Sequence, residues 1–292
     1  MMKTTDQIAL NDWYVVAALS NLAAGQTHQT RLLGQNISLK AGADGRPTCV
    51  EIDAGQPARV VEHVVVRYDF VWVCLGQPSR DIVDIPEIGA PGRRFIQRGR
   101  IGVATSAQRV IENFFDLSHF SFVHTGTLGG MDVTEVPPYS VNVRENGELW
   151  ATECRFFQPK ASAAIAGGVE IAYNYRVPRP LIAIIYKTSP SHSTENDIIG
   201  LFVQPRDETD CVVHSFGLMW DAVSSDAALL HFFHEVFAQD RSVLIHQLPK
   251  KLPLMPRREI PTHSDALSIA YRRWLDKSGL QFGVDRETAK AA

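Results

Sequence analysis

Alternating apolar and polar positions predict short strands in the first quarter of the chain. Residues 60–75 combine roughly alternating polarity with many β-branched and aromatic residues, and residues 13–18 and 30–40 have strand composition. The turn-forming run Ala43-Asp44-Gly45 lies between residues 30–40 and residues 60–75. Residues 76–102 contain many prolines and glycines, so we expect a linker there.

After the linker, the pattern predicts antiparallel strands between helices. A helix should begin after Thr105-Ser106, whose hydroxyls can cap it, and run through Phe115. Asn146-Gly147 is the strongest hairpin signal in the chain. The strands expected after it are residues 169–177, 181–188, 198–204 and 211–220, and the expected later helices are residues 225–248 and 264–277. Strands followed by a long helix favour an α+β fold over a parallel βαβ fold.

Composition excludes several classes of protein. The chain has 292 residues, of which 45% are hydrophobic, so it can bury a sizeable core without disulfides. A formal net charge of -3 gives no reason to expect nucleic acid or an anionic membrane as partner. No apolar run approaches the roughly 20 residues of a membrane span, and the polar start lacks a signal peptide. We therefore expect a cytoplasmic protein.

The cysteines indicate neither a zinc site nor a redox motif. Their positions are Cys49, Cys74, Cys154 and Cys211. No two of them lie within a few residues of each other, so the sequence has no CxxC motif. We expect four reduced thiols, most of them buried.

The densest group of chemically active side chains lies around His119 and His124. Two histidines and a carboxylate are the set that binds non-haem Fe(II) on one face. Residues five apart on an ideal helix differ by about 140° in direction. The two histidines can therefore share a metal only if the helix ends or unwinds between them. Asp116, three residues before His119, could be a ligand or could bond to His119 from outside the metal site.

Residues 113–124, N-F-F-D-L-S-H-F-S-F-V-H, resemble the mononuclear-iron motif of Rieske oxygenase alpha subunits, N-x-x-D-x-x-H-x4-H. They are most similar to the vanillate and alkaloid demethylase branch of that family. The resemblance implies that His119 and His124 bind iron. It also implies catalytic roles for Asn113 and Asp116, which belong to the same motif.

The third metal ligand is implied by a second stretch. Residues 237–244, F-A-Q-D-R-S-V-L, are similar to the family's helix that carries an aspartate ligand, and Asp240 occupies the matching position. Asp226 and Glu235 lie on the same predicted helix and are the alternatives.

The start of the chain resembles a Rieske domain without its cluster. The runs W-Y-V-V-A and V-R-Y-D-F-V-W-V-C-L-G-Q-P are similar to the opening and closing strands of that domain. Between these two runs, the sequence lacks the cluster-binding loops C-x-H and C-x-x-H that a [2Fe–2S] Rieske centre needs. We therefore expect no cluster in this chain. Residues 1–80 should form a vestigial Rieske-like β domain, and residues 81–292 a helix-grip catalytic domain.

The resemblance implies an Fe(II)- and O2-dependent monooxygenase subunit. It is similar to the cluster-less subunits that oxidatively remove a methyl group from 7-methylxanthine, giving xanthine and formaldehyde. Electrons would come from NADH through a separate reductase that carries a Rieske domain, and Asp116 would link the donor's cluster to an iron histidine. The resemblance also implies a homo- or hetero-oligomer, and a glutathione-transferase-like structural subunit as a further partner.

Three other functions are compatible with the sequence. A metal-free helix-grip protein would bind an apolar ligand and keep its histidines as vestiges. A structural subunit would only scaffold an active oxygenase. A hydrolytic zinc enzyme would need no NADH. Removal of His119 or His124 separates the first two from an iron oxygenase, because neither function depends on a metal.

For other charged groups, the sequence favours structural or solvent-exposed roles over metal binding. His231, His234 and Glu235 are neighbours on the long predicted helix, but they match no zinc signature. A group of arginines near the linker predicts a solvated face, or alternatively a docking patch for an acidic electron donor. These arginines are Arg93, Arg94, Arg98 and Arg100.

Overall fold

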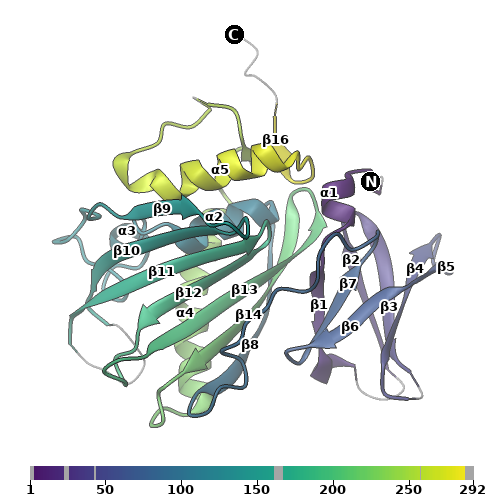
Figure 1. The fold of residues 1–292 in the computed structure, drawn as a ribbon, viewed down its shortest axis with the longest axis horizontal. Coiled ribbons are helices and arrows are strands. Elements are labelled where there is room, and N and C mark those ends of the chain that lie inside the picture. Colours follow the sequence, from purple (N-terminus) through teal and green to yellow (C-terminus); the bar gives the residue numbers. More distant parts are fainter. Residues whose placement is uncertain (1–2, 23–25, 43, 161–166, 257, 287–292) are drawn as a thin grey trace.

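A computed structural model describes residues 3–22, 26–42, 44–160, 167–256 and 258–286 of the chain. Its largest feature is a seven-stranded antiparallel sheet of order β8-β14-β13-β12-β11-β10-β9 (Figure 1). The strands are β8 (Arg94–Val103), β9 (Ser140–Val143), β10 (Leu149–Gln158), β11 (Val169–Arg179), β12 (Ile182–Thr188), β13 (Asn196–Asp207) and β14 (Asp210–Met219). The predicted hairpin at Asn146-Gly147 is confirmed, because it joins β9 to β10.

The helices complete the predicted α+β fold. They are α1 (Gln7–Leu10), α2 (Ala107–Phe115), α3 (Phe120–Val123), α4 (Asp226–Leu244) and α5 (Ala266–Ser278), with 3-10 turns at Leu19–Asn21 and His263–Asp265. The predicted cap is confirmed, because the Ser106 hydroxyl accepts a hydrogen bond from the Arg109 amide. Figure 1 shows α4 behind the large sheet and α5 above β9, along that edge of the sheet. Among the described residues, no helix has the length and apolar character needed to cross a bilayer.

Two small sheets precede the large one. Their orders are β1-β7-β6 and β2-β3-β4-β5. Their strands are β1 (Tyr14–Ala18), β2 (Thr27–Leu32), β3 (Gln35–Ala41), β4 (Pro47–Asp53), β5 (Gln56–Val61), β6 (His63–Arg67) and β7 (Phe70–Cys74). A parallel pair near the end of the chain joins β15 (Leu252–Pro253) to β16 (Val284–Asp285).

Three expectations about this part of the chain were wrong. Residues 30–40 form two strands joined at Leu33-Gly34, and residues 60–75 contain a second tight turn at Tyr68-Asp69. All four turn residues have positive φ, as two-residue type I′ hairpins require. Leu33 is fully buried, so the apolar pattern continues through the turn and hides it. The expected linker ends early, because residues 94–103 form β8.

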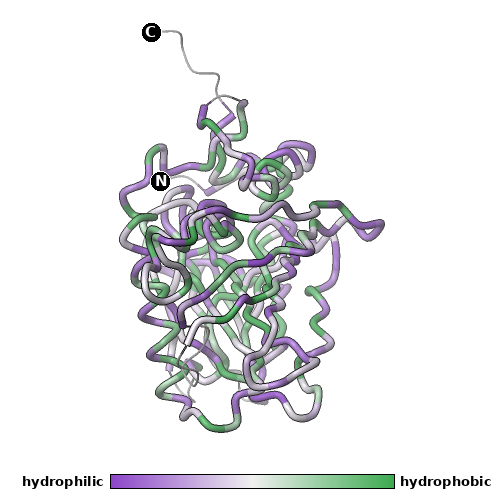
Figure 2. The backbone as a smooth tube through the Cα atoms, turned by 90° about the vertical axis from the view of Figure 1, so that its left-hand side faces the viewer, coloured by the Kyte–Doolittle hydropathy of each residue, from purple (hydrophilic) through white to green (hydrophobic). Residues whose placement is uncertain are grey.

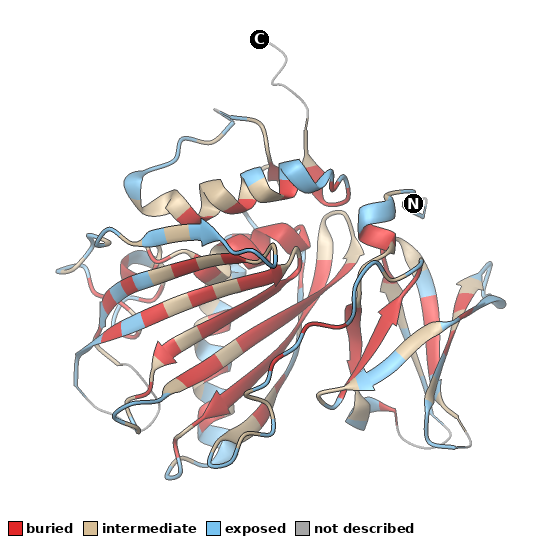
Figure 3. Ribbon diagram, viewed as in Figure 1, coloured by how far each residue is buried: buried red, intermediate tan, exposed pale blue. Residues whose placement is uncertain are grey.

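The large sheet is covered on both faces. Side chains of β12, β13 and β14 that include Ile184, Phe202 and Leu218 pack against the β1-β7-β6 sheet, and the Trp72 ring lies 4.8 Å from that of Phe202. Neighbouring residues on the same strands point the other way, toward α2 and α4. Figure 2 shows apolar segments gathered inside the molecule, and Figure 3 shows the alternation of burial along β10 and β11.

Candidate metal centre and its two cavities

His119 and His124 flank a single short helical turn. Helix α2 ends at Phe115, and Asp116 turns away from it with extended backbone angles (φ -75°, ψ 129°). His119 and His124 are the first and last boundary residues of α3. This break satisfies the condition that the spacing imposed. It brings the two Nε2 atoms to within 3.1 Å of each other.

Asp240 reaches the same point from α4. Its Oδ1 atom lies 3.1 Å from His119 Nε2 and 2.9 Å from His124 Nε2. Three ligand atoms held about 2.1 Å from one ion and about 90° apart lie about 3 Å from one another. The three observed separations match that value. The residues present therefore fit a divalent metal bound by two histidines and one carboxylate.

The far nitrogen of each imidazole is held by a hydrogen bond. His119 Nδ1 lies 3.2 Å from Asp116 Oδ2, and His124 Nδ1 lies 2.7 Å from Gln239 Oε1. When Nδ1 donates in both bonds, each Nε2 keeps its lone pair available to bind a metal ion. Sequence reasoning assigned no role to Gln239, although its position next to Asp240 was the available signal.

The protonation states of the histidines and carboxylates in this site depend on one another. Burial opposes the charged form of Asp240 and of Asp116, but hydrogen bonds from the histidines hold the pKa of both carboxyl groups below the usual value. Burial likewise opposes a charge on His119, yet its bonds to Asp116 and Asp240 raise its pKa to about 9. The metal-free site therefore keeps a proton that a bound cation would displace.

The alternative candidates lie elsewhere. Asp226 is exposed and forms an ion pair with Arg94. Glu235 is exposed, and His234 Nε2 lies 3.0 Å from the backbone oxygen of Arg98. Within the described ranges, His119, His124 and Asp240 are the residues brought together as a possible metal-binding group of three.

Two cavities meet at this site. An inner cavity of about 110 Å³ lies between the large sheet and α4, and His124 and Asp240 line it. An outer cleft of about 600 Å³ is formed by α2, α5 and the segment that follows α4, and Asp116 lines it. Asn113 and His119 line both. The bond between Asp116 and His119 therefore connects the outer cleft to the inner cavity.

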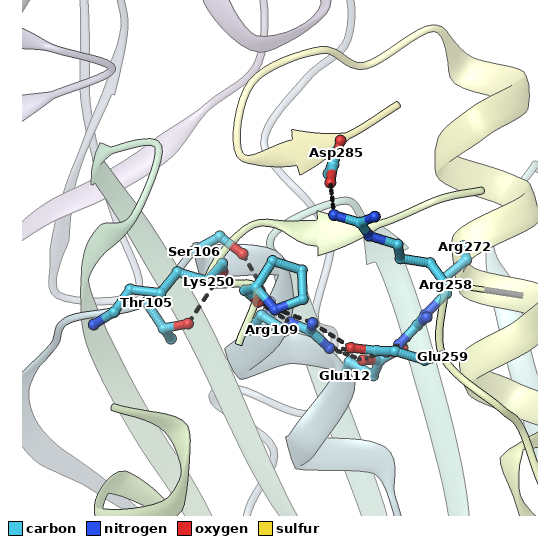
Figure 4. Close-up of polar contacts among 10 residues, drawn as sticks. Thr105, Ser106, Arg109, Glu112, Lys250, Arg258, Glu259, Arg272 and Asp285 are labelled. Carbon is cyan, nitrogen blue, oxygen red and sulfur yellow. Dashed lines mark hydrogen bonds and ion pairs between the residues drawn. The ribbon is translucent and has the colours of Figure 1, made fainter. Parts of the chain in front are cut away.

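An ion network forms one wall of the outer cleft (Figure 4). Arg109 has a fully buried side chain that donates to Glu259, with Nη2 and Oε1 2.5 Å apart, and to the Pro249 carbonyl at 2.9 Å. Arg272 on α5 binds Glu112 through two hydrogen bonds of 2.6 and 2.8 Å and also contacts Glu259. The network ties α2 to α5 and to the segment after α4.

The expected solvated face of arginines was wrong for Arg98. Its side chain is buried, and burial lowers its pKa to about 10. Arg98 and Ile96 point to the same side of β8, toward α4, because side chains alternate along a strand. Arg93 and Arg94 are also engaged, in ion pairs with Glu195 and Asp226.

All four cysteines are free and buried, as expected. Burial raises the pKa of Cys49 to about 12 and that of Cys74 to about 11. These two thiols, which lie in the small sheets, therefore keep their protons at neutral pH.

Comparison with known proteins adds a family signal. The sequence profile of the vanillate O-demethylase oxygenase C-terminal domain matches residues 103–280. A Pseudomonas sp. (strain TJI-51) protein described as a probable methylxanthine N7-demethylase, NdmC, is 42% identical over 287 residues, which is 98% of this chain and 100% of that one. Methylxanthine N1-demethylase NdmA of Pseudomonas putida is 31% identical over 216 residues, or 72% of this chain and 58% of the relative.

Solved structures support the fold. The structure of NdmB from Pseudomonas putida CBB5 superposes with a TM-score of 0.75 at 20% identity, covering 92% of this chain and 91% of that one. NdmA from the same strain with caffeine gives a TM-score of 0.75 at 19% identity, covering 91% and 90%. These matches extend over both the small sheets and the large one.

Proposed function

The chain belongs to the Rieske-type oxygenases of the vanillate O-demethylase family, and on that premise we propose that it is the iron-bearing subunit of a methylxanthine N7-demethylase. The observation that carries this proposal is the convergence of two imidazole Nε2 atoms and one carboxylate oxygen within 3.1 Å of one another. The relative that matches nearly the whole chain carries the N7-demethylase description, and this supports the choice of methyl group.

His119, His124 and Asp240 would hold Fe(II), which supplies reductive activation of O2 when bound. The proposed net reaction consumes O2, two electrons and two protons. It converts an N–CH3 group to N–H, formaldehyde and one water. The inner cavity supports this chemistry, because its largely aromatic and aliphatic wall excludes bulk water from the methyl group.

Asp116 would carry the contact between the electron donor and the metal site. Its carboxylate lines the outer cleft and accepts a hydrogen bond from His119, which lines both cavities. The sequence contains no C-x-H loop, and its C-x-x-H run, Cys211 to His214, lies within strand β14, so we propose that electrons come from another protein. We propose a reductase that carries its own Rieske domain and oxidises NADH. A glutathione-transferase-like subunit stays an expectation of the resemblance.

The missing cluster-binding loops are also the basis for the proposed division of the chain into two domains. Residues 1–80 would be a Rieske-like β domain without its cluster loops, and residues 81–292 the catalytic domain. The two small sheets lie within the first 74 residues, and the family profile begins at residue 103. Both observations support a boundary between them.

Reconstitution with a Rieske-containing NADH reductase of a Pseudomonas methylxanthine demethylase tests the proposal. The wild-type chain should release formaldehyde and xanthine from 7-methylxanthine in an NADH- and O2-dependent reaction. His124→Ala should lose both iron and turnover, whereas His231→Ala, a matched change at an exposed histidine, should lose neither. Asp116→Asn should keep its iron but turn over roughly 10–100-fold more slowly. Full turnover by His124→Ala would instead indicate a scaffolding subunit.

A further inference from the structure

The inner cavity contains two buried cationic side chains. Arg98, on β8, is 5% exposed, and Lys187, on β12, is 7% exposed. Both line the cavity that His119, His124 and Asp240 also line. Most of the remaining wall is apolar, and it includes Leu128, Ile185, Ile199, Leu229, Phe233 and Val236. Burying a charged side chain is costly, so two buried cations on one cavity wall strongly influence what that cavity can bind.

One buried carboxylate stands against the two cations. Asp197 pairs directly with Lys187 across β12 and β13, and its charge favours the protonated forms of both Lys187 and Arg98. Asp197 also accepts a hydrogen bond from the Trp220 amide. Burial still lowers the pKa of Lys187 to about 8. Arg98 and Lys187 thus present two cationic side chains to this part of the cavity.

The same cavity holds polar atoms that no described residue satisfies. Arg98 Nε, Gln158 Oε1 and the Tyr173 hydroxyl are buried, line the cavity and have no hydrogen-bond partner within the described part of the chain. Native proteins leave few such atoms unsatisfied, and each lost partner costs about 1–3 kcal/mol. These atoms are therefore available to an occupant of the cavity.

The position of Arg98 is fixed by its neighbours. Its guanidinium lies over the Phe233 ring, 4.9 Å from the centroid, and Nη2 lies 3.3 Å from Met219 Sδ. It crosses the strand at Gly217, where a Cβ atom would come within 2.7 Å of Nε. Phe233 precedes Asp240 on α4 by two turns, about 10 Å along the axis. The cationic groups and the metal site thus lie at separate places along one cavity.

We propose that Arg98 and Lys187 bind the acceptor edge of the substrate, a compact heteroaromatic ring with carbonyl oxygens or an anionic group, and so turn its N-methyl group toward the metal site. Gln158 and Tyr173 would bind the same ring edge. The inference deepens the proposed function and relies on it for the methyl group. A xanthine ring carries two carbonyl oxygens and an acidic N–H, so it has this chemistry, and so does an aromatic carboxylate.

The cavity size agrees with such a substrate. About 110 Å³ is smaller than the roughly 300–1,000 Å³ typical of pockets for drug-sized ligands. A compact ring is therefore a better match to this volume than a drug-sized ligand. Apolar walls would hold the ring faces. The buried cations would select the ring edge, because a ring without acceptor atoms would offer them no hydrogen bond and would bind poorly.

Calorimetric binding to the full-length protein loaded with Co²⁺ tests the inference without turnover. The probes are 7-methylxanthine, 4-methoxybenzoate, and 1-methylindole as an N-methyl bicycle without oxygens. We expect 7-methylxanthine to bind at least tenfold more tightly than 1-methylindole. Lys187→Met and Arg98→Lys should each lose at least tenfold in affinity for 7-methylxanthine and keep their affinity for 1-methylindole. Lys40→Met, a matched change at an exposed lysine, should alter neither.

Each outcome separates the inference from the proposed function. Wild-type affinity for 7-methylxanthine in Lys187→Met would overturn the inference, and so would equal binding of 1-methylindole or no binding of either oxygen-bearing probe. Binding of 4-methoxybenzoate alone, with the same dependence on Lys187, would support the acceptor edge and reject methylxanthine as substrate. If Arg98→Lys fails to fold, which circular dichroism would reveal, Lys187→Met still decides the question.

Discussion

The orientation of two imidazole rings determines what the metal site can bind. Asp116 and Gln239 hold the Nδ1 atoms of His119 and His124, so both Nε2 atoms face Asp240. A proton and a metal ion then compete for the same place. The carboxylates on either side raise the pKa of His119 to about 9, which makes the proton a strong competitor at neutral pH.

Metal binding should therefore release a proton. Below pH 9 the free site carries the His119 proton, and above it the site does not. The apparent affinity for a divalent ion should rise about tenfold per pH unit between pH 7 and 8.5 and then level off. Calorimetric titration with Co²⁺ at pH 7.5, in buffers of different ionisation enthalpy, should show about one proton released per ion. Release close to zero in the wild type would contradict the assigned charge state.

Asp116→Asn is the control for that titration. Removing the carboxylate takes away one of the two partners that raise the pKa of His119, so less than a full proton should be released at pH 7.5. An unchanged release in this variant would show that Asp116 does not influence the titration of His119.

At the scale of elements, polar contacts hold α2 at its start and along its length. Ser106 caps its start, Arg109 and Glu112 bind it to the segment after α4 and to α5, and Asp116 follows its last residue. Because Asn113 lines both cavities, a shift of this helix would move a wall shared by both. The ion network thus supports the position of the site residues that follow it.

Breaking this network should strongly destabilise the protein. Arg109→Met removes a fully buried cation and leaves Glu112 and Glu259 to share Arg272, so we expect a loss of about 3–5 kcal/mol in the free energy of unfolding. Arg155→Met, the same change in an ion pair that is 60% exposed on both sides, should cost about 0–1 kcal/mol.

Urea unfolding of the two metal-free variants under identical conditions measures the difference. The slope of the free energy with urea should not change, since neither substitution alters the surface exposed on unfolding by much. Equal losses in both variants would show that the buried network contributes no more than a surface pair.

Local signals predicted the elements that depend on local chemistry. The hydroxyl cap at Ser106 and the turn at Asn146-Gly147 were both visible in the sequence. The turn at Leu33-Gly34 was not, because its leucine is buried and continues the apolar pattern of the flanking strands. Strand β8 was hidden by the prolines and glycines before it, since pairing with β14 rather than composition makes it a strand.

The parts of the site that depend on contacts between distant segments could likewise not be predicted from local sequence. The motif around His119 placed two candidate ligands, and similarity placed Asp240 from α4 beside them. Gln239 gains its role only because α4 passes next to His124. Arg98 and Lys187 come from β8 and β12, and the sheet order that puts both on one cavity is not encoded in either segment alone.

On the scale of the whole molecule, the two faces of the large sheet have different neighbours. One face packs against the small sheets, and the other forms the inner cavity with α4. The outer cleft reaches the metal site through Asp116 and His119. In the proposed function, substrate and electron donor would therefore approach His119, His124 and Asp240 from different cavities.

Iron content, together with the EPR spectrum of the nitric oxide adduct of anaerobically purified protein, tests most directly whether this chain holds iron without a cluster. We expect about one iron per chain, a high-spin ferrous–nitrosyl signal, and no signal from a reduced [2Fe–2S] cluster. His119→Ala should lose the nitrosyl signal, and the exposed His231→Ala should keep it. Absence of iron in the wild type after anaerobic reconstitution with Fe(II), or an unchanged signal in His119→Ala, would contradict the proposed metal site.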